Sequence, residues 1–137
     1  MANTDLVKGY AGNYNVGRQI LDQKVCVKRY IDTTVTPLTS GADYSVIGYP
    51  ANTLITRAAL ITETVEGAAE SVDLRDDDSA TTTLCNDHDL NTDNAISNYS
   101  TGIFKATAGN LNILANAAIT VAKFWVYVEY TVMSTKD

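Results

Sequence analysis

The sequence has few of the side chains that metal and nucleophile chemistry require. It contains one histidine, His88, and two cysteines, Cys26 and Cys85. An imidazole-bound transition-metal centre needs several converging histidines, so a single histidine excludes it. Catalysis by serine or cysteine needs a base beside the nucleophile. No recognisable motif surrounds Cys85 and His88, so we expect His88 to lie in an exposed loop.

The motifs of other enzyme classes are missing as well. The sequence has no glycine-rich phosphate loop of the GxGxxG or GxxxxGK[ST] type. A glycosidase needs two carboxylates across a cleft, and the glutamates show no spacing that singles out a pair. We therefore predict a protein that is not an enzyme and that has no cofactor.

The chain also lacks an excess of positive charge and any long apolar run. Ten basic and sixteen acidic residues give a net charge of −6, which opposes binding to nucleic acid and to anionic membranes. No apolar run approaches the roughly 20 residues that span a bilayer. The start, "MANTDLVKGY", lacks a signal-peptide pattern, so we expect synthesis in a cytoplasm and two reduced, semi-buried cysteines.

Short segments rich in Thr, Val, Ile and Tyr, separated by Gly, Asn, Asp and Ser, make up most of the 137 residues. This pattern predicts an all-β domain over residues 24–137, in the form of a jelly-roll-like antiparallel β-sandwich, with a barrel as the alternative. The expected strands are 24–31, 43–49, 53–65, 69–75, 80–85, 103–107, 111–115 and 118–133. Hairpin turns are expected around Gly67 and around Gly109 and Asn110.

The last expected strand alternates clearly between two faces. One face carries Thr120, Ala122, Phe124, Val126, Val128, Tyr130 and Val132, and it is predicted to be core. The other face carries Trp125 and Tyr127 among charged residues, which is unusual for a surface that only contacts water. These two aromatic rings are candidates for an interface with another subunit, although a second layer of the same chain would cover them equally well.

Residues 1–23 differ from the rest of the chain. They show neither clean alternation nor a capped helix, so we interpret them as an extended N-terminal arm rather than part of the sandwich. The arm is too apolar for a purely solvated tail, and it is expected to dock on its own sandwich or on another subunit. Its candidate contact residues are Leu6, Val7, Tyr10, Tyr14 and Ile20.

The stretch "RDDDSATTTLCNDHDL" gathers many acidic side chains in sixteen residues, 75–90. Calcium binds six to eight oxygens, and Asp76, Asp78, Asp87 and Asp89 are weak candidates to supply them from adjacent loops. The spacing does not fit an EF-hand. Aspartates clustered in turns more often cap their own backbone, so we expect two acidic loops that bracket a short strand, and no metal site.

Three phrases in the sequence suggest a family. They are "MANTD" at the start, "YPANTLITRAALITETVEGAAESVDLRDDD" in the middle and "ATAGNLNILANAAITVAKFWVYVEYTVM" near the end. Together they resemble the capsid cement or decoration proteins of tailed bacteriophages. The resemblance covers most of residues 49–133, and residues 8–46 carry no matching phrase.

The resemblance implies a structural virion protein. Such a protein would bind the major capsid protein on the outer surface of an assembled shell and stabilise it, commonly as a homotrimer. An alternative is a lectin-like module on the virion surface that contacts a host glycan, with Tyr30, Tyr44, Tyr49 and Tyr99 as residues that could stack on sugars.

Overall fold

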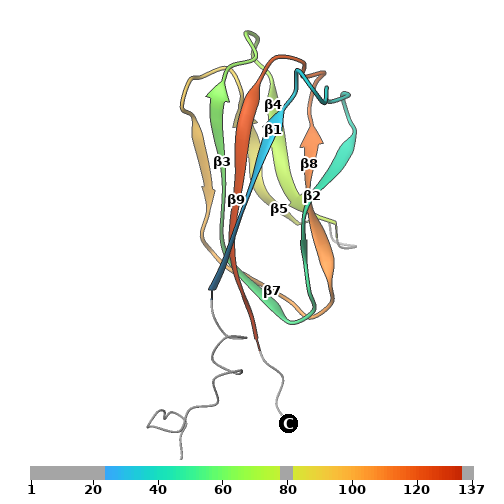
Figure 1. Cartoon of the computed structure of the whole chain (residues 1–137), viewed down its shortest axis with the longest axis vertical. Coiled ribbons are helices and arrows are strands. Elements are labelled where there is room, and N and C mark those ends of the chain that lie inside the picture. The colour runs from blue at the N-terminus through green and yellow to red at the C-terminus, as the bar shows by residue number, and fades with distance from the viewer. Residues whose placement is uncertain (1–23, 78–81, 134–137) are drawn as a thin grey trace, which may run out of the picture.

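The chain forms two antiparallel β-sheets that pack face to face (Figure 1), in a computed structural model that describes residues 24–77 and 82–133. The first sheet has the strand order β1-β9-β3-β6, and β7 also pairs with β3. Its members are β1 (Lys24–Asp32), β9 (Lys123–Val132), β3 (Thr53–Thr64), β6 (Ile96–Tyr99) and β7 (Ile103–Lys105). The second sheet has the order β2-β8-β4-β5. Its members are β2 (Asp43–Tyr49), β8 (Gly109–Ala115), β4 (Ser71–Asp76) and β5 (Thr83–Asp89). The prediction of an all-β antiparallel sandwich is confirmed.

The alternation of apolar residues decides which face of each strand is buried. In β9, Phe124, Val126 and Val128 are buried between the sheets, as predicted. Thr120 was expected to join them but is exposed, because it lies in the connection before β9 rather than in the strand. From the second sheet, side chains of β2, β4 and β8 fill the same core: Ile47, Val72, Leu74, Leu111 and Ile113.

The two predicted hairpins are both wrong. Gly67 does have a positive φ of 92°, but the segment around it connects β3 of the first sheet to β4 of the second. Gly109 is the first residue of β8 and pairs with Tyr49 of β2. A glycine signals a local change in chain direction, but it does not specify which sheet the next strand joins.

The region from 83 to 99 holds more strand than the sequence predicted. The stretch "NDHD" belongs to β5 rather than to a loop, and β6 was not expected. On β5, both Cys85 and His88 face the core, although their positions differ by three, an odd number. The ladder between β4 and β5 shifts register between these residues, and Asp87 has a positive φ of 52°. An irregularity of this kind changes which side chains face inward, so simple alternation fails here.

His88 is therefore a buried residue and not the expected exposed loop histidine. Its Nδ1 lies 2.7 Å from the Ser97 hydroxyl, and its Nε2 lies 2.8 Å from the Thr62 hydroxyl. The Thr62 hydroxyl also donates to the Asp89 carbonyl at 2.8 Å. All three contacts are satisfied when the proton sits on Nε2 and Ser97 donates to Nδ1. Burial lowers the pKa of His88 to about 4, partly opposed by the charge of Asp89, so the ring is neutral near pH 7.

A carboxylate joins two connections at one end of the sandwich. Glu66, just after β3, accepts hydrogen bonds from the backbone N–H groups of Thr120, Val121 and Ala122 at 3.2, 2.9 and 2.8 Å. Burial raises the pKa of Glu66, but the three donors outweigh this effect and the net shift is downward. Glu66 thus fixes the segment that leads into β9.

The described residues also show the state of the two cysteines and whether any helix could span a membrane. Both cysteines are free thiols, but Cys26 is exposed and Cys85 is buried, so neither is semi-buried as expected. Burial raises the pKa of Cys85 to about 11, which keeps it an unreactive thiol. In residues 24–77 and 82–133, no helix has the length and apolar character needed to cross a membrane.

Candidate interface on the outer face of the first sheet

The outer face of the first sheet carries a row of large side chains that lie directly beside one another. In the strand register, Ile96 of β6 is opposite Ile61 of β3, Ile61 is opposite Trp125 of β9, and Trp125 is opposite Tyr30 of β1. Ile96, Trp125 and Tyr30 are 58%, 37% and 41% exposed. We call Tyr30, Ile61, Ile96 and Trp125 the outer row. It crosses four adjacent strands, so its side chains form one continuous apolar strip.

Tyr30 and Trp125 form an aromatic pair within the outer row. Their ring centroids are 4.8 Å apart and the rings are tilted by 49°. The Tyr30 hydroxyl donates a short hydrogen bond to Glu63, and this bond raises the pKa of Tyr30 to about 12. Since this hydrogen bond engages the hydroxyl, the exposed part of Tyr30 is mainly its apolar ring, and the side chain is held in one orientation.

A charged cluster lies next to the outer row on the same face. Arg57 lies 5.4 Å above the Tyr127 ring and 3.7 Å from Glu129, and Lys24 lies 3.2 Å from Glu129. The Tyr127 hydroxyl contacts Cys26 and donates to Glu129, and both contacts raise the pKa of Tyr127. Apolar side chains beside charged and polar ones are the usual composition of a protein interface.

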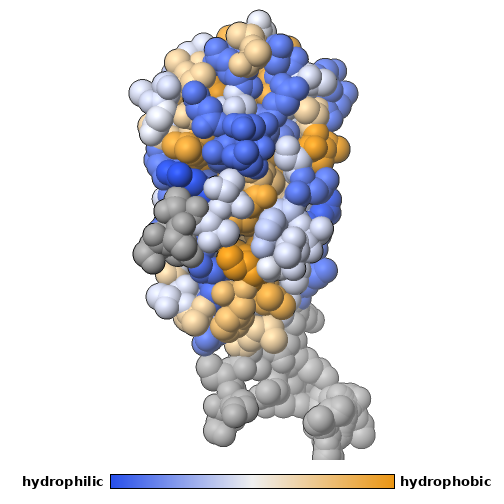
Figure 2. All heavy atoms as spheres, turned by 180° about the vertical axis from the view of Figure 1, so that it is seen from behind, coloured by the Kyte–Doolittle hydropathy of each residue, from blue (hydrophilic) through white to orange (hydrophobic). Residues whose placement is uncertain are grey.

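The outer face of the second sheet has a different character. Asp43 of β2 lies 2.9 Å from Arg75 of β4, and Asn112 and Asp73 occupy the same face. In Figure 1, β4 and β5 lie behind β1 and β9, and the view from behind in Figure 2 is mainly blue over its upper part, with orange residues gathered lower down. The exposed large apolar side chains that lie on described strands all belong to the first sheet, and they are Val25, Tyr30, Ile96, Phe104 and Trp125. The first sheet therefore has the more apolar outer face.

The structure brings together only some of the predicted interface residues. Trp125 and Tyr127 both lie on the outer face of the first sheet, as expected, with Trp125 exposed and Tyr127 half-buried. Leu6, Val7, Tyr10, Tyr14 and Ile20, like the rest of the predicted arm, lie outside the described residues.

The weak calcium candidates among the described residues, Asp76, Asp87 and Asp89, do not form a metal site. Asp76 is 1% exposed and paired with Lys105, while Ser71, at the other end of β4, is the residue that pairs with Asp89. The carboxylate of Asp89 accepts hydrogen bonds from Asn91 and Thr92 of its own turn. No group of three or more potential ligands occurs among the described residues, which do not include Asp78.

The four tyrosines proposed for sugar stacking do not form one cluster, although Tyr30 and Tyr44 line the same pocket of about 230 Å³. Tyr49 is buried, and its hydroxyl donates to Asp76. The Tyr99 hydroxyl donates to the Gly102 carbonyl, and the Tyr44 hydroxyl accepts from the Thr39 backbone. Only Tyr30 of these four is an exposed large side chain, and its ring lies beside that of Trp125.

The sequence did not identify Ile61 and Ile96 as parts of a surface. Ile61 lies in a run of apolar residues on β3 whose inward and outward members look alike in sequence, and β6 was not predicted. The available signal was the β-branched Ile96 within an otherwise mostly polar stretch, a residue type that is enriched in strands.

Comparison with solved structures relates this fold to phage capsids. A chain in the acid-stable capsid structure of Helicobacter pylori bacteriophage KHP30 matches with a TM-score of 0.63 and 14% identity, over 81% of this chain and 89% of that one. A chain of the cyanophage Pam1 capsid matches with a TM-score of 0.62 and 14% identity, over 94% and 96%. A chain of the Ralstonia phage GP4 capsid matches with a TM-score of 0.59 and 14% identity, over 95% and 90%.

At the level of sequence, no protein-family model and no curated protein matches. The likeness to the three phage structures is therefore one of fold. It shows that this chain has the jelly-roll-like, two-sheet architecture of chains present in phage capsids.

Proposed function

We propose that this chain is a cement, or decoration, protein that binds the major capsid protein on the outer surface of a bacteriophage capsid and strengthens the shell. The observation that carries the proposal is the fold shared with chains of three phage capsids over 81%, 94% and 95% of this chain. The protein would be made in the host cytoplasm, reside in the virion and act without catalysis. Its working form would be a homotrimer.

The outer row supplies the contact that this function needs. An aromatic pair fixed by a hydrogen bond, inside an apolar strip that crosses four strands, has the properties of an interface centre. The charged cluster of Arg57, Lys24 and Glu129 would form the polar rim. The predicted arm, residues 1–23, would extend the contact to a neighbouring subunit.

The direct test compares capsids that lack the protein with the same capsids after addition of the full chain. We expect the temperature at which the shell releases its DNA, measured with a DNA-binding dye, to rise and to saturate at a fixed ratio of protein to capsid subunits. Unchanged release together with binding to host cells or to a glycan array would contradict the cement role and support the lectin-like alternative. The mass of the purified protein in solution tests the trimer, which a stable monomer would exclude.

A further inference from the structure

A lysine and an aspartate from opposite sheets meet at one end of the sandwich. Lys105 is the last residue of β7, and Asp76 is the last residue of β4. The Lys105 Nζ lies 2.5 Å from Asp76 Oδ2, and the two side chains are 13% and 1% exposed. This pair is thus a contact between the two sheets from which most water is excluded.

The surroundings of the carboxyl group distinguish its two oxygens. The Tyr49 hydroxyl donates a hydrogen bond of 2.6 Å to Oδ1. Oδ2 accepts no hydrogen bond from the described residues, so its close contact with Lys105 Nζ is not aligned as one. A donor on Oδ1 stabilises negative charge that develops there when a nucleophile attacks the carboxyl carbon. The Lys105 Nζ lies beside Oδ2, the oxygen that would be lost as water in such a reaction.

An ammonium group has no free lone pair, and a carboxylate is a poor electrophile, so the ion pair itself does not condense. When a small rotation of the Lys105 side chain aligns an N–H group with Oδ2, one proton can pass to that oxygen, which removes both charges and leaves an amine next to a carboxylic acid, the reactive combination.

We propose that Lys105 and Asp76 condense to an intramolecular isopeptide bond. The Nζ lone pair attacks the Asp76 carboxyl carbon, and a C–N bond forms while Oδ1 carries the negative charge towards Tyr49. The bond between the carbon and Oδ2 then breaks, and Oδ2 leaves as water with the proton it received and a second proton from Nζ. One amide and one water result, with no change in net charge and no oxidant or other reactant.

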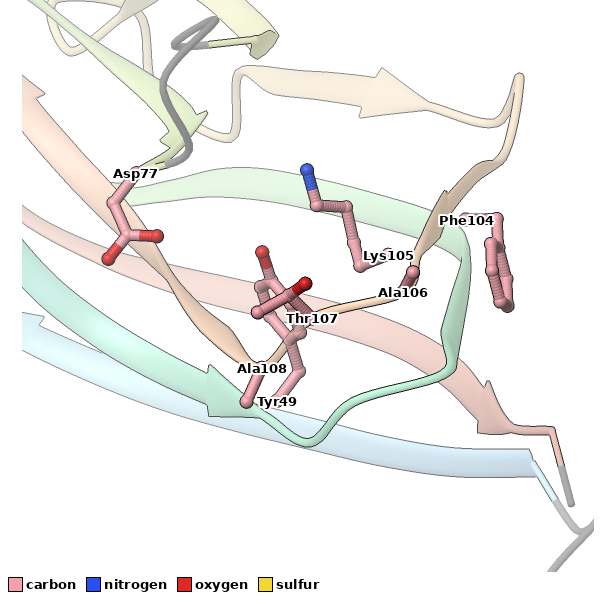
Figure 3. A pocket seen from close by; sticks show the side chains of 7 residues that line it. All are labelled: Tyr49, Asp77, Phe104, Lys105, Ala106, Thr107 and Ala108. Atoms are coloured by element: carbon pink, nitrogen blue, oxygen red, sulfur yellow. The ribbon is translucent and has the colours of Figure 1, made fainter. Parts of the chain in front are cut away.

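Proximity supplies the driving force for this condensation. Two groups held in contact react with effective molarities on the order of 10⁵ M or more. This proximity offsets the equilibrium that, in dilute solution, favours the separate amine and acid over the amide. Lys105 and Tyr49 also line a pocket of about 380 Å³ with Asp77 and Thr107, and the released water can leave through it (Figure 3). The product would tie β4 to β7 covalently and resist separation of the sheets.

The intact mass of the purified full-length protein tests the proposal. We expect the native chain to be lighter than its sequence mass by one water molecule, and Lys105→Arg to have its full sequence mass, because a guanidinium stays protonated and does not attack a carboxyl group. A native chain of full sequence mass, also after prolonged incubation of the folded protein, would overturn the proposal.

Proteolysis locates the bond and excludes dehydration elsewhere. Trypsin should fail to cleave after Lys105 in the native chain, because the amide removes the charge that trypsin recognises. Chymotrypsin should release two peptides that remain joined, one containing Asp76 and the other Lys105. A water loss that maps to any other residue would contradict the assignment. With Tyr49→Phe, the folded chain should lose water more slowly, and an unchanged rate would exclude Tyr49 as the donor.

Discussion

The Nε2 atom of His88 lies 2.8 Å from the Thr62 hydroxyl and so joins β5 of one sheet to β3 of the other. Because Nδ1 is also engaged, with Ser97, the neutral ring is satisfied on both sides. A second proton on the ring would require Ser97 to give up its donated hydrogen bond and would place a charge between the sheets.

Acid should therefore destabilise the fold through His88. Its pKa is lowered from 6.5 to about 4, so its contribution is complete above pH 6.5 and is lost as the pH falls towards 4, with a total of about 3 kcal/mol. Urea unfolding at a series of pH values would measure this loss. In His88→Gln, whose amide can donate to Thr62 and accept from Ser97 without titrating, the slope of the unfolding free energy between pH 6.5 and 4 should be smaller. Equal slopes for the two proteins would refute the role of His88.

Trp125→Ala should weaken binding to the capsid more than it weakens the fold. If the ring lies at the centre of the interface, the loss of binding free energy should be about 2 kcal/mol or more. Titration of capsids with the labelled variant would measure it, and thermal unfolding would monitor the fold. Val121→Ala removes an exposed apolar side chain outside the strands and should bind normally. Normal capsid binding by a destabilised Trp125→Ala variant would exclude the outer row as the interface.

Deletion of residues 2–22 should leave a folded sandwich that binds the capsid poorly. The core residues described above, and Val27 and Ile31 of β1 that pack against them, all follow residue 23, so the deletion removes none of them. Circular dichroism and thermal unfolding would assess the fold, and capsid titration the binding. An unfolded product would mean that the segment is part of the core, and full binding would mean that it is not a contact.

Glu66→Gln should loosen the connection that leads into β9. The amide offers one acceptor oxygen in place of two charged ones and turns an NH₂ group towards backbone donors, which should cost about 1–2 kcal/mol. Hydrogen exchange of the amides of Thr120, Val121 and Ala122 should become faster. Because the pKa of Glu66 is lowered on folding, its contribution is present above the ordinary glutamate pKa and is lost as the pH falls through the lowered value.

The control for this variant is Glu70→Gln. Glu70 Oε1 accepts no hydrogen bond from the described residues, so the same change of charge there should leave exchange at residues 120–122 unaltered. Equal exchange rates in both variants would contradict the anchoring role of Glu66.

Gly109→Ala should destabilise the fold by a steric clash. A Cβ atom at this position would lie 2.6 Å from the Tyr49 hydroxyl and 3.1 Å from an oxygen of Asp77, so Tyr49 would have to move away from Asp76. The cost should be about 1–3 kcal/mol in urea unfolding. In a Tyr49→Phe background the same substitution should cost less, because the hydroxyl is gone. A cost that does not depend on residue 49 would place the strain elsewhere.

Alternation in single strands was sufficient to predict much of the fold. The inward face of β9, with Phe124, Val126 and Val128, and the outward position of Trp125 follow from a period of two residues, which is a property of the extended backbone itself. Composition and turn residues likewise predicted the all-β class and the bounds of β2. Each of these features depends on neighbours within a few residues of the chain.

Tertiary structure alone decided how the strands meet. The burial of His88 depends on a register shift against β4, the outer row depends on four strands lying side by side, and the contact of Lys105 with Asp76 depends on two sheets facing each other. These contacts join residues 16 to 95 positions apart, and nothing in a local pattern specifies such partners. Local sequence patterns thus determined most strands and which of their faces are buried. Packing of the strands and sheets determined the outer row, the burial of His88 and the contact between Lys105 and Asp76.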